Sequence, residues 1–587
     1  MSDDDNWPRL VQVAWQLHDA KGKLLSNHNY IVKPEGFTIP YNAEKVHGIS
    51  TERATREGHA LEKVLAVFHR DVEKANYLVG HNIGFDINVV GSEFLRKQIP
   101  MKLQSMKEMD TKDLSTDFCA LPGGKGGKYK WPTLTELHHK LFGNGFQDAH
   151  DAAYDVAATA KCFFGLITQK VISPEKGILV SEVIYEAPTL DAANFANAKD
   201  EQKTAAKDVL KAAGTADISV MTDMPFSHLH VHTQYSVLQA TSEIPAMIAL
   251  AKEMKMPAIA MTDHGNMMAA FNFVKEALAK EIKPIIGCEF NLTKDRNNKS
   301  QKDDGYQTVL LAKNKKGYHN LAKLSSYANI QGYYYLPRID KEVLVEYKSD
   351  LIATTGGLWG EIPYLILNVG DTQAEEAFVW WKEQFGEDFY VELNRHGIPE
   401  EEKVNEILLH FAHKYGVKYF AANNTYYNHK NDAKAHDILL CVKDGELVEK
   451  PKKYIGKRGR EYRYGFPNDE FYLKSPEEMK KLFADLPEAI ACTNEIVEKI
   501  ETYKLQRDVL LPNFQIPEEF NNPLDKEDGG KRGENAYLKY LTYEGAKKRY
   551  PVLTDEIRER LEFELATIEK TGYPGYFLIV QDFTGAA

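Results

Sequence analysis

The chain has 587 residues, which is too long for one hydrophobic core and indicates about three or four domains. Its formal net charge of −12 excludes general electrostatic attraction to phosphates, so any contact with nucleic acid has to come from local basic patches. The five cysteines are scattered and form no CxxC pair, which is typical of a reducing compartment. Because no apolar run approaches the ~20 residues of a membrane span and the N-terminus has no apolar signal segment, we expect a cytoplasmic protein without a membrane anchor.

The first segment, from about residue 7 to about residue 172, begins with an expected pair of strands. Residues 10–17 alternate between apolar and polar side chains, as a half-buried strand does. A turn at residues 21–23 and a strand-like run at residues 30–32 supply a second strand. The segment is therefore predicted to open with an antiparallel pair.

Two polar clusters follow in the same segment. Asp86 comes just after a short apolar strand, and Asp155 lies on the first turns of a helix that His150 precedes. Two carboxylates can hold divalent ions, and a histidine beside them can deprotonate a water for in-line attack on a phosphodiester. The alternative interpretation of the second cluster is a solvated helix start capped by Asp151.

Together the clusters resemble the DEDD-type 3′→5′ exonucleases that proofread for DNA polymerases. Residues 42–50 are similar to the Val-His-Gly-Ile loop of that family. Residues 80–86 are similar to its second motif, and residues 150–155 to its third. The resemblance covers nearly all of the first segment.

This resemblance implies a ribonuclease H-like fold that acts on a single-stranded 3′ end of DNA. By the same resemblance Asp86 and Asp155 would bind Mg²⁺ or Mn²⁺, and His150 would be the general base. The first motif of the family, an Asp-x-Glu on the opening strand, has no counterpart, because no such strand precedes Trp7. Either the chain was cut upstream or the domain has lost two of its four acidic ligands. We therefore expect a domain without its first strand, and a poor nuclease.

A glycine-rich segment with lysines and aromatic residues lies within this domain, at residues 123–131. Lys125 and Lys128 could follow a single strand of DNA by charge while the aromatic rings stack on bases. The same composition is equally typical of a mobile surface loop. From about residue 173 to residue 224 the sequence is polar and alanine-rich, which predicts a tether between domains.

A histidine-rich motif opens the next segment. His228, His230 and His232 alternate, which places their side chains on one face of an extended segment. His264 follows a buried strand-like run and Glu289 ends the next one, where parallel α/β barrels keep their functional groups. Imidazole and carboxylate ligands together favour zinc, manganese or iron. The alternative is a set of buried histidines that are only hydrogen-bonded within the core.

Strand-like and helical runs alternate through this segment, which predicts a parallel barrel. The expected strands are residues 257–261, 283–289, 308–312, 351–355, 389–393 and 417–422. The span resembles the polymerase and histidinol phosphatase (PHP) domain, a distorted (β/α)₇ barrel with a metal site at its mouth. A longer series of segments resembles the bacterial C-family replicative DNA polymerases, among them residues 317–321, 392–397, 471–475 and 572–580.

The PHP resemblance implies a set of metal ligands that this chain keeps only in part. Four residues occupy the matching positions: His230, His232, His264 and Glu289. Four others stand where metal-replete members carry ligands: Gln239, Gln307, Asn424 and Tyr426. Since charge-balancing carboxylates are missing, we expect one Zn²⁺, Mn²⁺ or Fe ion, or none. The barrel is therefore expected to be mainly structural, with weak or no phosphoesterase activity.

The strongest basic patch, residues 450–463, is interleaved with aromatic residues and includes Lys457, Arg458 and Arg460. These cations could contact a phosphate backbone or hold a neighbouring domain. Both interpretations stay open from the sequence.

These observations predict a multidomain chain of mixed α/β class. We expect an exonuclease-like domain truncated at its N-terminus (1–175), a linker (176–225), a PHP barrel (226–505) and the start of a polymerase palm (506–587). Amphipathic helices are expected to begin near Ala536 and Leu553. The catalytic aspartates of the palm are not among these residues.

The resemblance implies the N-terminal part of a replicative DNA polymerase. The whole protein would copy a primer-template and bind the sliding clamp and other replisome subunits. One alternative is a free-standing, metal-dependent PHP phosphoesterase. The four positions at which this chain lacks a metal ligand of the PHP family argue against it. Another is a non-catalytic replisome scaffold, which would bind its partners without metal.

Overall fold

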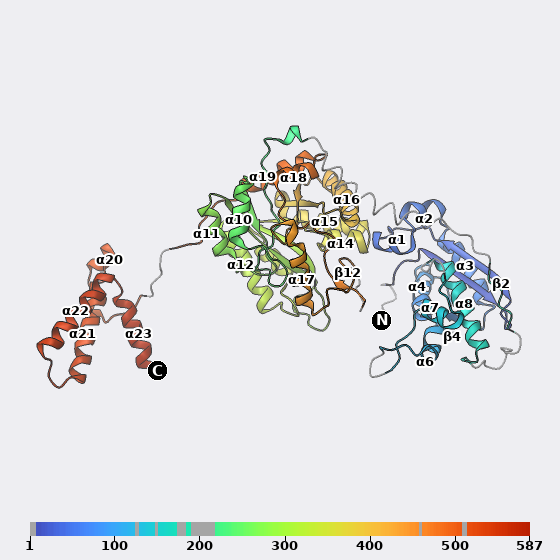
Figure 1. The fold of residues 1–587 in the computed structure, drawn as a ribbon, viewed down its shortest axis with the longest axis horizontal. Coiled ribbons are helices and arrows are strands. Elements are labelled where there is room, and N and C mark those ends of the chain that lie inside the picture. The colour runs from blue at the N-terminus through green and yellow to red at the C-terminus, as the bar shows by residue number, and fades with distance from the viewer. Residues whose placement is uncertain are drawn as a thin grey trace. The chain divides into compact units, whose positions relative to one another are not determined.

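The computed structural model describes residues 7–101, 103–123, 128–146, 151–172, 183–188, 218–456, 461–507 and 513–587 (Figure 1). The chain divides into two compact units, Met1–Tyr503 and Lys504–Ala587. The predicted mixed α/β class is confirmed. Of the helices in the described ranges, none is long and apolar enough to cross a membrane. Most of the expected linker and several predicted site residues lie outside the described residues: Lys125, His150, Lys457, Arg458 and Arg460.

The exonuclease-like domain contains two separate two-stranded sheets. β1 (Gln12–His18) pairs antiparallel with β2 (Leu24–Ile31), which confirms the predicted pair. β3 (Tyr77–Gly80) is the short strand expected before Asp86, and it pairs in parallel with β4 (Lys107–Asp110). The helices of this domain are α1 (Tyr41–His47), α2 (Thr51–Glu57), α3 (Leu61–Val72), α4 (Ile83–Arg96), α5 (Thr111–Leu114), α6 (Thr116–Cys119), α7 (Leu134–Phe142) and α8 (Ala152–Thr168).

Each of the two small sheets packs against its own hydrophobic cluster. In the first cluster Leu61, Val64 and Leu65 of α3 follow the i, i+3, i+4 spacing of a helical face and pack with Trp15 of β1. The second cluster is built around Leu137 of α7 and the apolar face of α8, with Val79 of β3 at its margin. The described core of this domain therefore has two main clusters, and a smaller third one is formed by Ile39, Ile49 and Ala54.

A curled, seven-stranded sheet forms the barrel domain. Its strands are ordered β11-β10-β9-β7-β6-β5, and β8 pairs with β6 off this path. The strands are β5 (Ala258–Met261), β6 (Lys283–Thr293), β7 (Tyr306–Ala312), β8 (Arg338–Asp340), β9 (Leu351–Thr354), β10 (Phe389–Asn394) and β11 (Tyr419–Ala422). The helices along this span are α10 (Ile244–Glu253), α11 (Ala270–Ala279), α12 (Lys315–Ile330), α13 (Lys341–Tyr347), α14 (Glu361–Asn368), α15 (Asp371–Phe385), α16 (Pro399–Tyr415), α17 (Ala433–Asp444), α18 (Pro476–Leu482) and α19 (Pro487–Lys499).

The expectation of an all-parallel barrel is wrong at one strand. β7 runs antiparallel to both β6 and β9, whereas the pairs β5–β6, β9–β10 and β10–β11 are parallel. Residues 294–305, which join β6 to β7, contain no helix. Parallel neighbours are usually joined by a crossover that contains a helix, so this helix-free connection returns the chain in the opposite direction.

The histidine-rich segment links the two ends of the curled sheet. On one side the amide nitrogens of Ala260 and Thr262 donate to the carbonyls of His228 and Val231. On the other side the amide of His232 donates to the carbonyl of Thr425, just beyond β11. Residues 228–232 therefore lie between β5 and the end of β11, and the side chains of His230 and His232 reach the buried cluster.

The C-terminal unit is helical where it is described. It contains α20 (Leu524–Asp528), α21 (Arg532–Arg549), α22 (Asp555–Thr571) and α23 (Pro574–Ala586). The two predicted helices are confirmed as α21 and α22. Thr554 caps α22 by accepting a hydrogen bond from the amide of Ile557, which explains why the helix begins at Asp555.

Candidate metal centres

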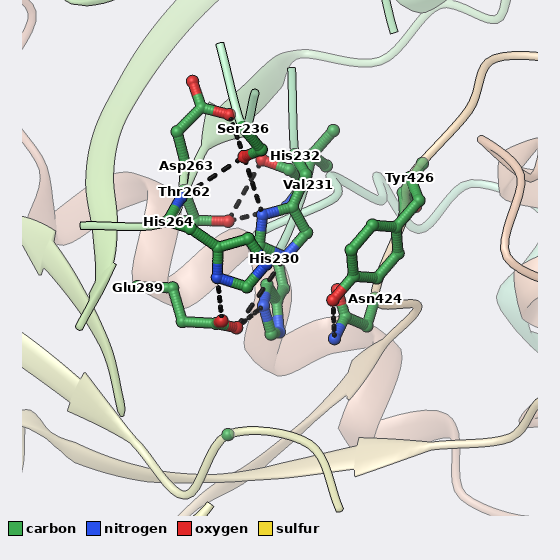
Figure 2. A network of polar contacts seen from close by, with 12 residues as sticks. His230, Val231, His232, Ser236, Thr262, Asp263, His264, Glu289, Asn424 and Tyr426 are labelled. Atoms are coloured by element: carbon green, nitrogen blue, oxygen red, sulfur yellow. Dashed lines mark hydrogen bonds and ion pairs between the residues drawn. The ribbon is translucent and has the colours of Figure 1, made fainter. Parts of the chain in front are cut away.

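The barrel brings together four residues that the sequence predicts as ligands (Figure 2). His230 donates from Nε2 to Glu289 Oε2 at 2.9 Å, and His264 Nδ1 lies 2.6 Å from Glu289 Oε1. Ligand atoms of His230, His232 and Glu289 lie within 4.8 Å of one another, and all three side chains are buried. These three residues could hold one metal ion.

A fifth residue, Glu392 of β10, belongs to this cluster and was missed by sequence reasoning. His230 Nδ1 donates to Glu392 Oε1 at 2.7 Å. Asn394 and Thr354 also donate to the Glu392 carboxylate, at 3.0 Å and 2.8 Å. The signal in the sequence is an acidic residue within an otherwise buried strand, because a buried charge needs a partner.

The ionised side chains of the cluster stabilise one another's charged forms. Burial disfavours the His230 imidazolium, but the charge of Glu392 and the hydrogen bonds to Glu289 and Glu392 outweigh burial and raise the pKa of His230 to about 10. Burial likewise opposes the Glu289 carboxylate, yet the charge of His264 and the hydrogen bond from His230 hold its pKa well below the usual value. One imidazolium is thus flanked by two carboxylates.

His232 stays neutral and lies between two aromatic rings. Burial, followed by the charge of His264, lowers the pKa of His232 well below its ordinary value. Its ring stacks on His264 at 4.3 Å and on Tyr426 at 4.4 Å between centroids. Tyr426 Oη in turn lies 3.5 Å from Asn424 Nδ2 (Figure 2). Two neutral side chains, Asn424 and Tyr426, therefore occupy the wall of the cluster where further anionic ligands would be needed.

His228, the first histidine of the motif, lies away from the cluster. His228 Nε2 donates to the carbonyl of Lys474 at 2.8 Å. Alternation gives the three side chains a common face but not a common position, because four residues of extended chain advance by about 13 Å. Asp263 also faces elsewhere, since it accepts hydrogen bonds from Thr233 and Ser236.

Two of the residues that depart from the PHP ligand pattern lie outside the cluster. Gln239 accepts from His436 through its backbone carbonyl and from Lys443 through its side chain. Gln307 pairs with Asn291 across β6 and β7. Among the four departures, Asn424 and Tyr426 are the ones that contact the cluster.

The exonuclease-like domain brings two predicted ligands to one cavity. Asp86 lies in the first turn of α4 and Asp155 in the first turn of α8, and both line a cavity of about 2290 Å³. Solvent reaches Asp86 through this cavity, but the surrounding protein desolvates its carboxyl group. This desolvation, with smaller contributions from the charges of Asp110 and Asp155, raises the pKa of Asp86 to about 6. Like charges near a desolvated carboxylate are typical of a site that binds a cation.

The surface beside Asp86 carries a cation and an aromatic ring. The Lys112 ammonium lies 4.7 Å from the ring centroid of Trp131 and donates to Asn82 Oδ1 at 2.8 Å. Trp131 is 66% exposed, so its ring could stack on a base. Lys128, which is predicted to contact nucleic acid, lies shortly before Trp131 in the sequence and is exposed.

The described part of the basic patch at residues 450–463 is bound within the protein. Arg463 is buried and donates to both carboxylate oxygens of Asp437 at 2.8 Å. Lys452 also pairs with Asp437, and Lys450 pairs with Glu446. These contacts favour the interpretation in which the described cations hold neighbouring segments together.

Three parts of the chain match family models. Residues 14–163 match an exonuclease model, residues 228–396 match the PHP domain, and residues 536–587 match the bacterial DNA polymerase III alpha NTPase domain. These matches confirm the exonuclease and PHP resemblances.

Curated relatives carry the name DNA polymerase III subunit alpha. The chain is 43% identical over 363 residues to the protein of Borreliella burgdorferi, which covers 61% of this chain and 30% of the relative. It is 38% identical over 368 residues to the protein of Treponema pallidum, and this match covers 62% of this chain and 30% of that relative. The chain thus spans about a third of the length of these relatives.

The solved structures similar to this chain match it with low TM-scores. In an E. coli ExoI–ssDNA complex with zinc, the match is 22% identical and covers 28% of this chain and 37% of that chain, with a TM-score of 0.23.

The chain contains an exonuclease domain, a PHP domain and a segment of the DNA polymerase III alpha NTPase domain, and about three fifths of it is similar to bacterial DNA polymerase III alpha subunits.

Proposed function

We propose that the chain is the N-terminal part of a bacterial DNA polymerase III alpha subunit that synthesises DNA on a template and proofreads it. The observation that carries this proposal is the order of the matched segments, with exonuclease first, PHP second and polymerase NTPase third. In this proposal residues 1–175, 176–225, 226–505 and 506–587 are the exonuclease domain, linker, barrel and start of the palm. The polymerase active site belongs to the rest of the longer protein.

In the exonuclease domain, Asp86 and Asp155 would hold Mg²⁺ or Mn²⁺. The bound ion supplies Lewis-acid polarisation of the phosphate and of the attacking water. His150 is proposed as the base that takes the proton of that water. Trp131 and Lys112 would orient the terminal nucleotide by stacking and charge, because they form an exposed aromatic and cationic surface next to Asn82. Of the predicted basic residues, Lys125, Lys128, Lys457, Arg458 and Arg460 remain proposed contacts to DNA.

In the barrel, His230, His232 and Glu289 would hold one Zn²⁺, Mn²⁺ or Fe ion at most, with His264 beside them. Support comes from the ion pairs of His230, whose positive charge already offsets part of the negative charge of the two carboxylates. We propose that this domain is mainly structural, since Tyr426 and Asn424 supply no charge for further cations.

The proposed partners are a single-stranded 3′ end, the primer-template, the sliding clamp and other replisome subunits, all in the cytoplasm. Similarity to the alpha subunits supports this set. Binding of the clamp without any nuclease activity would favour the scaffold alternative. Hydrolysis of small phosphate esters would favour the phosphoesterase alternative.

The experiment is degradation of a 5′-labelled single-stranded oligonucleotide with Mn²⁺, beside an oligonucleotide with a blocked 3′ end. We expect slow, stepwise shortening of the free 3′ end and none of the blocked one. Internal cutting of both substrates would contradict the proposal.

A further inference from the structure

Helix α12 of the barrel domain carries basic residues but no acidic ones. Its sequence contains three lysines and one histidine, whereas the whole chain has 85 acidic against 73 basic residues. The buried face of the helix packs against β6, β7 and β8. Exposed side chains follow one another at intervals of three or four residues, which places them on one face of the helix: Lys315, His319, Lys323, Ser326 and Ile330. We call this exposed face the basic stripe.

The acidic residues near the basic stripe are bound to other side chains. Asp350 pairs with Lys316 at 3.0 Å. The next helix, α13, has two acidic residues, Glu342 and Glu346. The first pairs with Arg296 at 3.1 Å, and the second accepts a hydrogen bond from the tyrosine that follows it. The basic stripe therefore keeps a positive charge on a chain whose net charge is −12.

Two exposed tyrosines continue the basic stripe beyond the end of α12. Tyr333 and Tyr335 are 52% and 67% exposed, and grouped exposed rings are typical of an interaction site. The Lys302 ammonium lies 5.6 Å from the ring centroid of Tyr335. Tyr335 also has a left-handed backbone with φ 64°, a costly conformation that is often found at binding sites. Exposed rings beside cations are the arrangement on which single strands of nucleic acid bind.

A buried arginine holds the tyrosine loop in place. Arg338 donates to the carbonyl of Gly332 at 2.9 Å and to three carbonyls within residues 296–303 at 3.1 to 3.3 Å. Its guanidinium lies 5.4 Å from the ring centroid of Tyr334. The loop with the tyrosines and the loop with Lys302 are thus fixed to one another. A surface that is already ordered loses little conformational entropy when a ligand binds.

We propose that the basic stripe and the loop with Tyr333 and Tyr335 bind a short segment of single-stranded DNA. The lysines would neutralise backbone phosphates, and the two exposed rings would stack on bases. Helix α12 is about 24 Å long, so one strand could contact the stripe and the loop together. A duplex would gain only the phosphate contacts, because its bases are already stacked. This DNA contact lies in the barrel domain, needs no metal and goes beyond the proposed exonuclease reaction.

The first test measures binding of fluorescein-labelled oligothymidylate to the full chain by fluorescence anisotropy. EDTA is present so that no strand is degraded, and the result is therefore independent of exonuclease activity. Binding should be saturable and should weaken as the salt concentration rises. It should be at least fivefold tighter than the binding of a duplex of the same length, since only a single strand offers free bases for stacking.

Photocrosslinking locates the DNA on the protein. Oligonucleotides that contain 5-iodouracil crosslink to aromatic side chains under ultraviolet light. After digestion with trypsin, we expect the crosslink on the peptide of residues 324–338, which contains both exposed tyrosines. DNA bound to the exonuclease domain would label a different peptide, which contains Trp131, so the two sites are distinguishable.

Two pairs of charge reversals provide the matched comparison. Lys315→Glu/Lys323→Glu reverses two lysines of the basic stripe, and Lys255→Glu/Lys434→Glu reverses two exposed lysines on other elements. Within the residues that the structure describes, none of these four lysines forms an ion pair, so neither double variant breaks one. The first pair should weaken DNA binding at least tenfold and the second less than twofold. Circular dichroism checks that both variants are folded.

The contribution of the rings is tested separately. Tyr333→Ala/Tyr335→Ala should weaken the single strand at least tenfold and leave the affinity for the duplex unchanged, because stacking is lost and the phosphate contacts remain.

Several results would overturn the proposal. These are absence of binding at low salt, equal weakening by both pairs of charge reversals, and crosslinks confined to peptides outside residues 324–338. Equal affinity for single strand and duplex would contradict the stacking role of the tyrosines. Unchanged DNA affinity in Lys315→Glu/Lys323→Glu would overturn the assignment to DNA and favour an acidic protein as the partner of the stripe.

Discussion

His230 and Glu392 form an ion pair of 2.7 Å in the interior of the barrel. The pair joins the histidine segment to β10, and its second partner, Glu289, joins the same imidazole to β6. The cluster is therefore held together by charges of the protein itself.

The Glu392→Gln variant tests this pair. The variant replaces one of the two carboxylates that bind the His230 imidazolium with a neutral amide and weakens a buried, charge-assisted hydrogen bond, so we expect a loss of about 1–3 kcal/mol in unfolding free energy. Urea denaturation followed by circular dichroism measures this loss. Glu376→Gln on the exposed face of α15 is the control and should change stability by at most about 0.5 kcal/mol. A similar small change in both variants would contradict the structural role of the pair.

The double variant Asn424→Asp/Tyr426→His tests why the barrel is expected to bind little metal. An aspartate and a histidine would add a charge and a ligand beside His232, so the affinity for Zn²⁺ should rise at least tenfold over the parent. Isothermal titration with Zn²⁺ measures the affinity. Unchanged affinity in a folded double variant would show that these two residues do not limit metal binding.

The pH dependence of stability provides a third prediction. Burial lowers the pKa of His436 to about 4, and its Nε2 donates to the carbonyl of Gln239 at 2.8 Å. The folded pKa lies below the unfolded value of 6.5, so protonation favours the unfolded state. The contribution of neutral His436 to the free energy of unfolding is complete above pH 6.5. It decreases by about 3 kcal/mol as the pH falls toward 4. His436→Gln should flatten the stability profile in that range, and an unchanged profile would contradict the assignment.

Metal binding by the exonuclease domain should depend on pH near neutrality. Because the pKa of Asp86 is raised to about 6, its carboxyl group is increasingly protonated below that pH. We expect the apparent affinity for Mn²⁺ to fall up to tenfold per pH unit below 6. Mn²⁺ titrations at pH 5, 6 and 7 measure this affinity. The Asp86→Asn variant should lose the dependence of the affinity on pH. A parent with equal affinity at all three values would argue against Asp86 as a ligand.

The sequence predicted the buried strands well, because residues such as 258–261 and 389–393 are nearly continuous apolar runs. It did not predict the direction of β7, since direction depends on the connection at residues 294–305 and not on the apolar pattern. The predicted ligands His230, His232, His264 and Glu289 do lie together. Glu392 was missed because one charge in a strand does not reveal its partner.

The interrupted sheet of the first domain was only partly predictable. The sequence indicates that a motif on an opening strand is missing, but not that β1 and β3 border one large cavity. That arrangement depends on how α4 and α8 pack, which periodicity does not specify.

The measurement that tests the account most directly is the rate of 3′-end degradation by the parent, Asp155→Ala and His264→Ala, with Mn²⁺. We predict that Asp155→Ala abolishes the slow degradation and that His264→Ala retains it. Loss of activity in His264→Ala alone would assign the nuclease to the barrel and contradict the account. An inactive parent would contradict the expectation of slow degradation by this chain.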